Sequence, residues 1–287
     1  MFLMDGTPGG RIKSTVANWT GLAYRIPRTE IERCKNISYL KQSGVYFLFG
    51  TSDDTGKPVA YIGQAGNRKN GEGILERLSE HKKNPEKDYW IEAVVFTTSN
   101  NSFGPTEISF LENKFCSLAI KAGRYEVKNA NDPFPGHITE EKESELEEFA
   151  EYAKIIMGTF GHKIFEPLDS TQKISVESDN NDVEEIPLLF LKRHIKSANF
   201  TVEATGRQTS EGFVVLKGSK ISPDEKTKVL GPGIIKARKN ANIDSKNILR
   251  EDVLFQSPSS AAGFVTGNSS NGLKDWKTKD GISLKDL

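Results

Sequence analysis

Two apolar runs, each with a glycine and a tyrosine, constrain the fold of this 287-residue chain more than any other feature. The runs span 44–49 and 59–63 and are rich in β-branched and aromatic residues, whereas 51–58 between them consists mostly of turn formers. Short β-prone runs separated by such a break are typical of a β-hairpin. Alternate side chains of a strand share a face, so the pattern predicts that Tyr46 and Tyr61 point to the same surface.

Further elements follow the hairpin in a regular order. A Gly/Asn-rich loop leads to a predicted helix at 72–83, and the apolar run 90–96 predicts a third strand. Another helix is expected to begin at Pro105 and to stop before Gly123, because proline favours the first helical position and glycine the C-terminal cap. We therefore expect an α+β fold with a small three-stranded antiparallel sheet flanked by helices.

The chain is long enough for two domains, and shifts in composition indicate where they begin and end. An acidic helix is expected at 140–157, a polar Asp/Asn/Ser-rich linker follows, and alternating strands then begin a second small α+β domain. The predicted segments are an N-terminal extension, 1–42, that packs on the first domain and ends in a helix from Arg28 to about Leu40; the first domain with its trailing acidic helix, 43–165; a linker, 166–185; and the second domain, 186–287.

The zero net charge hides an asymmetry along the chain. Residues 1–131 carry 18 basic and 14 acidic side chains, residues 132–187 carry 4 and 15, and residues 188–287 carry 17 and 10. Two mildly basic blocks thus flank an acidic one, which suits nucleic acid contact at both ends, although ordinary solvated surfaces would give the same pattern.

Composition also bears on the compartment. No signal peptide is visible, and no run of about 18 apolar residues could span a membrane. Cys34 and Cys116 form neither a disulfide framework nor a cysteine-based zinc site. The expectation is a cytoplasmic protein without membrane contact.

Several polar residues downstream of the hairpin stand on elements that otherwise have core character. Arg77 and His81 are one turn apart on one helix, Glu112 lies on the next, and Asn129 follows it. Phosphodiester hydrolysis needs an activated water, a cation to hold the phosphate, and stabilisation of transition-state charge. A tyrosine acts as a base near neutrality only if a nearby cation lowers its pKa from about 10, and Arg77 would supply that charge.

The ordered set Gly44-Val45-Tyr46, Tyr61-Ile62-Gly63, Arg77, Glu112 and Asn129 resembles the GIY-YIG nuclease family over about residues 43–131. The resemblance implies an endonuclease with a single protein ligand, Glu112, for a divalent Mg²⁺ or Mn²⁺ ion. It also implies that Tyr46, Tyr61, Arg77, His81 and Asn129 match the family's other site residues.

This chain departs from the family pattern at two points. Valine at position 45 replaces the isoleucine of the first motif, and Glu112 precedes Asn129 by a long interval, so Asn131 is an equally good match. The resemblance leaves open which tyrosine acts as the general base.

The second domain contains basic residues that could track a phosphate backbone, and an aromatic residue that could stack on bases. A core role for the aromatic residue and a solubilising role for the basic ones are equally compatible. This domain is similar to an uncharacterised domain that is often appended to GIY-YIG modules. The predicted nucleic-acid contacts across the chain are Arg68, Lys69, Lys236, Arg238, Lys239 and Trp276, with Lys274, Lys277 and Lys279 as further candidates.

The functional expectation is metal-dependent cleavage of nucleic acid, with DNA favoured over RNA. Roles in restriction or defence and in structure-selective repair remain equally open. The alternative from another class is a binding module that keeps the fold, has lost cleavage, and acts as a nucleic-acid or protein adaptor.

Overall fold

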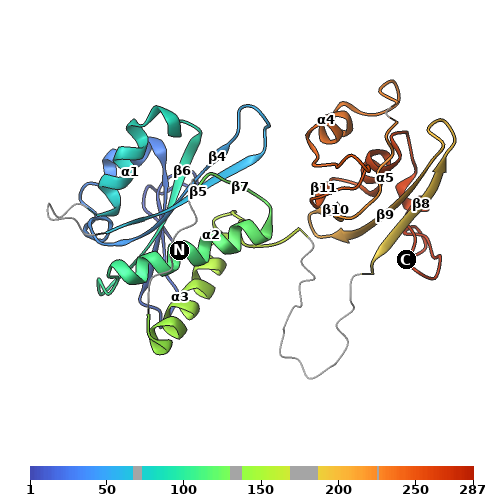
Figure 1. The fold of residues 1–287 in the computed structure, drawn as a ribbon. Coiled ribbons are helices and arrows are strands. Elements are labelled where there is room, and N and C mark those ends of the chain that lie inside the picture. Colours follow the sequence, from blue (N-terminus) through green and yellow to red (C-terminus); the bar gives the residue numbers. More distant parts are fainter. Residues whose placement is uncertain (67–72, 130–137, 169–186, 225) are drawn as a thin grey trace. The chain divides into compact units, whose positions relative to one another are not determined.

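The computed structural model describes residues 1–66, 73–129, 138–168, 187–224 and 226–287. The chain divides into two compact units, Met1–Glu166 and Pro167–Leu287 (Figure 1). Each unit has its own sheet and its own apolar core, so the α+β class predicted from the sequence is confirmed. Within the described residues, no helix combines the length and the apolar character that crossing a membrane requires.

The first unit is built on a mixed sheet that has seven strands in the described residues. The order across the sheet is β1-β2-β3-β6-β4-β5-β7, and every pairing is antiparallel except the one between β5 and β7. The strands are β1 Phe2–Leu3, β2 Ile12–Ser14, β3 Gly21–Pro27, β4 Gly44–Thr51, β5 Pro58–Ala65, β6 Trp90–Thr98 and β7 Glu126–Val127.

The sheet is wider than the three strands predicted. Strands β6, β4 and β5 are the predicted set, and they lie side by side in antiparallel order. The N-terminal segment adds β1, β2 and β3, because β3 pairs with β6 along its whole length from Gly21 to Pro27. The predicted helix from Arg28 to Leu40 is instead two short 3-10 helices, η1 (Arg28–Cys34) and η2 (Ser38–Lys41).

Alternation along β4 divides the first unit into two cores. Val45, Phe47 and Phe49 face one core, whereas Tyr46 and Leu48 face the other, as the two-residue period of a strand requires. Helices α2 (Pro105–Ala122) and α3 (Glu140–Thr159) cover the first face, and α1 (Ile74–Lys83) with η1 and η2 covers the second (Figure 1). A further 3-10 helix, η3 (Pro85–Lys87), follows α1.

Helix α2 begins and ends where its sequence predicts. Pro105 occupies the first turn, and Glu107 accepts a hydrogen bond from the Gly104 backbone N–H at 3.0 Å. Gly123 caps the other end in the left-handed conformation, with φ 66°. Because both ends are fixed, the helix turns Ile108, Leu111 and Phe115 toward the sheet.

The second unit is a four-stranded antiparallel sheet packed against helices. The order is β11-β10-β9-β8, and Ser257 caps the N-terminus of α5 by accepting a hydrogen bond from the Ser260 backbone N–H. The elements are β8 Leu189–Ile195, β9 Phe200–Thr209, β10 Gly212–Val215, α4 Pro232–Asn240, β11 Val253–Phe255, α5 Pro258–Thr266 and α6 Gly272–Asp275. Of the predicted linker 166–185, residues from 169 onward lie outside the described residues.

Candidate active site

Tyr46 and Tyr61 lie on the same face of the hairpin formed by β4 and β5. Tyr46 is opposite Gly63 and Tyr61 is opposite Leu48, so the tyrosines form a diagonal pair. Their ring centroids are 6.2 Å apart. Tyr46 is fully buried, whereas Tyr61 keeps part of its surface open to solvent. The predicted juxtaposition of the two phenols is therefore confirmed, and Tyr61 is the more accessible of the two.

The glycines of the two tripeptides are fixed by close packing. A Cβ at Gly63 would lie 2.4 Å from the Tyr46 hydroxyl oxygen, and one at Gly44 would lie 2.3 Å from the Phe96 carbonyl oxygen. Real Cβ atoms do not approach other atoms so closely. Gly63 thus leaves the space in which the Tyr46 hydroxyl sits, and Gly44 lets β4 lie against β6.

We expect Gly63→Ala to displace the Tyr46 hydroxyl and to lower the free energy of unfolding by about 1–3 kcal/mol, the usual cost of overpacking a core. Gly66→Ala is the matched control, because a Cβ there would be 3.8 Å from Ile108, an ordinary contact. Urea unfolding of both variants measures the difference. Equal stabilities would mean that Gly63 is not needed for packing around Tyr46.

Helix α1 brings His81 and Arg77 to the tyrosines. The Tyr46 hydroxyl and His81 Nε2 are hydrogen-bonded at 2.7 Å, and the His81 ring is 5.3 Å from that of Tyr61. Burial, with Lys87 and Arg77 nearby, lowers the pKa of His81 to about 3, and burial raises the pKa of Tyr46 above its usual value. Both groups are therefore neutral near pH 7, and one proton lies between the phenol oxygen and Nε2.

The positive charge of Arg77 acts on both phenols. Its Nη1 pairs with Glu80 at 2.6 Å, one turn along the same helix. Burial raises the pKa of Tyr61, and the positive charge of Arg77 acts in the opposite direction. The guanidinium is about one-third exposed, so it can meet a solvent-borne anion while it favours the phenolate form of either tyrosine.

Glu112 lies on α2 and contacts β5 through Gln64. Its Oε2 accepts a hydrogen bond from Gln64 Nε2 at 2.9 Å, and Gln64 follows Gly63 on β5. Burial raises the pKa of Glu112, and its negative charge in turn raises the pKa of both Tyr46 and Tyr61. The charge of Glu112 therefore acts on both phenols, although α2 covers the other face of the sheet.

A divalent ion fits the chemistry of Glu112. Among the described residues, Glu112 forms no ion pair with a lysine or arginine, and no group of three His, Cys, Asp or Glu side chains gathers. Magnesium keeps several waters and is often held by one or two carboxylates together with substrate phosphates. A half-buried carboxylate whose pKa is raised by burial would gain a favourable partner from such a cation.

Asn129 acts on the backbone of β5. Its Oδ1 accepts from the Ile62 N–H at 3.1 Å, and its Nδ2 donates to the Ile62 carbonyl at 2.7 Å. The side-chain amide thus continues the parallel pairing that β7 makes with β5 at Val59 and Ala60. Asn129 holds the strand that carries Tyr61. Its alternative, Asn131, and the predicted contacts Arg68 and Lys69 lie outside the described residues.

Lys87 also lies beside Tyr61, although nothing in the sequence distinguishes it from the lysines before it. Its Nζ lies 3.2 Å from the centroid of the Tyr61 ring. Burial and the charge of Arg77 lower the pKa of Lys87 to about 8. The sequence signal was weak because Lys82 and Lys83 precede it in the same charged stretch.

In the second unit, two of the predicted nucleic-acid contacts are structural instead. Trp276 is 0% exposed, and its Nε1 donates to the Pro258 carbonyl at 3.0 Å, so the ring cannot stack on a base. Arg238 donates to the carbonyl oxygens of Phe264, Ser222 and Asp224. Lys236 and Lys239 on α4 are exposed, as are Lys274, Lys277 and Lys279.

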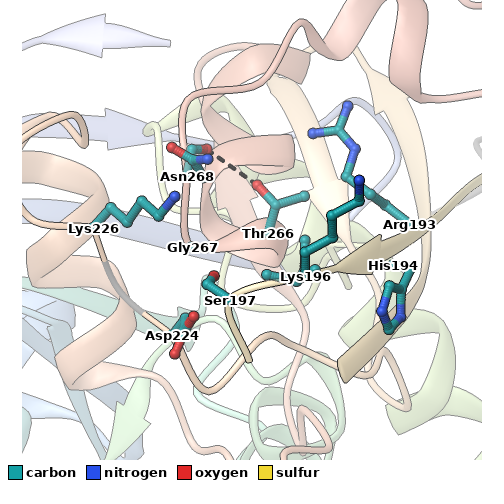
Figure 2. Close-up of a pocket in the computed structure, with 10 residues that line it drawn as sticks. Arg193, His194, Lys196, Ser197, Asp224, Lys226, Thr266, Gly267 and Asn268 are labelled. Carbon is teal, nitrogen blue, oxygen red and sulfur yellow. Dashed lines mark hydrogen bonds between the residues drawn. The ribbon is translucent and has the colours of Figure 1, made fainter. Parts of the chain in front are cut away.

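A pocket of about 390 Å³ in the second unit gathers other basic side chains. Figure 2 shows Arg193, His194 and Lys196 at the end of β8 together with Lys226, and Thr266 and Asn268 at the end of α5. Asp275 pairs with Arg193 at 2.7 Å. The lining residues are Arg193, His194, Ile195, Lys196, Ser197, Asp224, Lys226, Thr266, Gly267 and Asn268.

Comparison with known proteins bears on the second unit. Residues 194–287 match a family described as a domain of unknown function, DUF4357. No curated protein and no solved structure matches the chain.

Proposed function

We propose that the first unit is a metal-dependent endonuclease of the GIY-YIG type that hydrolyses phosphodiester bonds in nucleic acid, with DNA as the favoured substrate. The observation that carries the proposal is the contact of Tyr46, Tyr61 and His81, with the charges of Arg77 and Glu112 acting on both phenols; these five residues, the active-site cluster, come from four separate elements. The antiparallel strands β6, β4 and β5 would correspond to the three-stranded sheet of such a module.

Arg77 and Glu112 have complementary roles in this proposal. The Arg77 guanidinium offers a planar fork of donors that suits the oxygens of a phosphate. Glu112 would hold Mg²⁺ or Mn²⁺. Such an ion, when bound, polarises phosphoryl oxygens and supplies positive charge. Together the two side chains would offset the charge that develops on the phosphate in the transition state.

Tyr61 would accept the proton of the attacking water, with Tyr46 and His81 beside it. Tyr61 is partly exposed and is therefore the phenol that a water can reach, while Tyr46 is buried against His81. Burial raises the pKa of both phenols and the Arg77 charge opposes that rise, so Arg77 would favour the Tyr61 phenolate that accepts the proton of the attacking water. His81 would orient Tyr46 through their hydrogen bond.

The proposal is tested with a panel of labelled substrates, namely duplex DNA, single-stranded DNA, branched DNA and RNA, each incubated with the whole chain. We expect fragments in Mg²⁺ or Mn²⁺ and none in excess EDTA. Cleavage that persists in EDTA would contradict a metal-dependent mechanism. Tight binding without cleavage of any substrate would favour the adaptor alternative.

The second unit is expected to supply much of the affinity for nucleic acid, because residues 188–287 carry an excess of seven basic side chains. A fragment ending near Glu185 should bind more weakly than the full chain. Its log affinity should also fall less steeply with log salt, since each neutralised phosphate contributes about −0.9 to that slope on duplex DNA. Loss of three contacts would change the slope by about 2 to 3.

Fluorescence anisotropy across a salt series measures both slopes, with Glu112→Gln introduced into both proteins to prevent cleavage. Identical slopes for the fragment and the full chain would mean that the second unit does not touch the phosphate backbone.

A further inference from the structure

Lys87 is held in place from both sides. Helix α1 ends at Lys83, and Asn84 then caps η3 by accepting a hydrogen bond from the Glu86 N–H at 2.9 Å. The Lys87 backbone N–H donates to the Asn84 carbonyl at 3.1 Å. On the far side, the Arg28 guanidinium donates to the Asp88 carbonyl at 2.9 Å. The short 3-10 turn is thus fixed at both ends.

The Lys87 side chain lies over an aromatic ring. Its ammonium is 3.2 Å from the Tyr61 ring centroid, within the range of a cation–π contact. This contact favours one direction for a side chain whose four-carbon stem is otherwise flexible. The ammonium is therefore directed to the face of the sheet on which the phenols lie.

The charges around Lys87 are mostly of its own sign or neutral. Tyr61 faces it from β5. On α1, the charge of Arg77 lowers the pKa of Lys87, and the charge of Lys87 lowers the pKa of His81. The carboxylate of Glu80 is directed to Arg77. Within the part of the chain that the structure describes, no carboxylate lies within ion-pair distance of the Lys87 ammonium.

A half-buried ammonium beside a guanidinium, with no carboxylate of its own, is unfavourable in the free protein. Burial and repulsion by Arg77 express this cost as a pKa lowered to about 8. Lys82, on the same stretch, has Glu32 at 4.0 Å. An anion that approached Arg77 and Lys87 together would offset the repulsion between them.

We propose that Lys87 is a substrate-binding residue whose ammonium contacts a phosphate oxygen of the nucleic-acid strand beside the one that Arg77 contacts. The inference rests on the proposed function for its ligand. It assigns Lys87 to binding, however, and leaves the chemical step to Arg77, Glu112 and the tyrosines.

The proposal has a consequence for pH. The ammonium loses its proton as pH rises through about 8 in the free protein, and the neutral amine no longer attracts a phosphate. Bound phosphate favours the charged form, so binding raises the pKa of Lys87 and takes up a proton near pH 8. Affinity for nucleic acid should therefore be full below this pH and decrease above it.

The test measures binding of a labelled DNA duplex to the full-length Glu112→Gln protein in EDTA, between pH 6.5 and 9.0 at constant ionic strength. Three further substitutions are compared in this background, namely Lys87→Met, Lys87→Arg and, as a control, Lys83→Met at the exposed end of α1. A thermal melt of each protein confirms that it is folded.

We expect Lys87→Met to weaken binding at pH 7 by about tenfold, the effect of losing one hydrogen bond to a charged group. The weakening between pH 7 and pH 9 should disappear in Lys87→Met. Lys87→Arg should bind tightly at both pH values, because its guanidinium stays charged. Lys83→Met should follow the parent protein.

Unchanged affinity in Lys87→Met would overturn the proposal, and so would a Lys87→Arg protein that weakens with pH as the parent does. A protein that binds no nucleic acid at all would overturn it as well. Because the readout is binding without metal, a chain that binds through Lys87 but never cleaves would contradict the endonuclease proposal alone.

Discussion

Replacing Glu112 with glutamine is expected to abolish divalent-dependent cleavage. Glutamine keeps the size of the side chain and an oxygen that can accept the hydrogen bond from Gln64. It removes the negative charge that would hold the metal, which supplies several kcal/mol of transition-state stabilisation in such enzymes. A loss of about 4 kcal/mol corresponds to a rate lower by about 10³-fold.

The same substitution should leave the fold intact. Burial raises the pKa of Glu112, so the folded protein disfavours the ionised carboxylate relative to the unfolded chain. The neutral amide removes this cost, and the midpoint of thermal unfolding should stay the same or rise. Glu148→Gln on the exposed face of α3 is the matched control for both measurements. Full activity in Glu112→Gln would rule out Glu112 as the metal ligand.

Arg77→Lys should separate chemistry from binding. Lysine keeps the positive charge but loses the planar fork of donors, so we expect kcat to fall by about 10² while KM changes far less. Steady-state kinetics on the best cleaved substrate measure both constants. The control is Arg33→Lys, since Arg33 pairs with Glu30 on η1 and is 59% exposed.

Which of kcat and KM changes in Arg77→Lys decides the role of the guanidinium. A drop in kcat with a similar KM means that the guanidinium acts mainly in the transition state. An unchanged kcat with a raised KM would make Arg77 a docking contact for the substrate, with a role like that proposed for Lys87.

Local patterns in the sequence were sufficient to predict the hairpin and the helix that carries Glu112. The strand period fixes the shared face of Tyr46 and Tyr61, and the proline and glycine at its ends fix α2. Each of these features depends on residues that are close together in the chain.

Features that depend on distant partners were not predicted. The first unit has β3 beside β6, a pairing of residues about 70 positions apart, and no local pattern identifies such a partner. The sequence left Trp276 open between a stacking surface and a core, because tryptophan suits both, and only its contacts with Pro258 and Phe213 decide for the core. Lys87 was not predicted either, because its contact with Tyr61 depends on the path of the chain after α1.

The most direct test of the endonuclease proposal is the single-turnover cleavage rate, measured in one Mg²⁺ buffer on the substrate that the panel identifies as best cleaved. The whole chain is compared with Tyr46→Phe, Tyr61→Phe, Arg77→Lys and Glu112→Gln, and with Glu148→Gln on the exposed face of α3 as a control outside the cluster. We expect each of the four cluster variants to be slower by about 10² or more, as is usual when a group that stabilises the transition state or transfers a proton is removed, and the control to match the parent. Cleavage by all of the variants at the parent rate would contradict the assignment of this cluster as an active site.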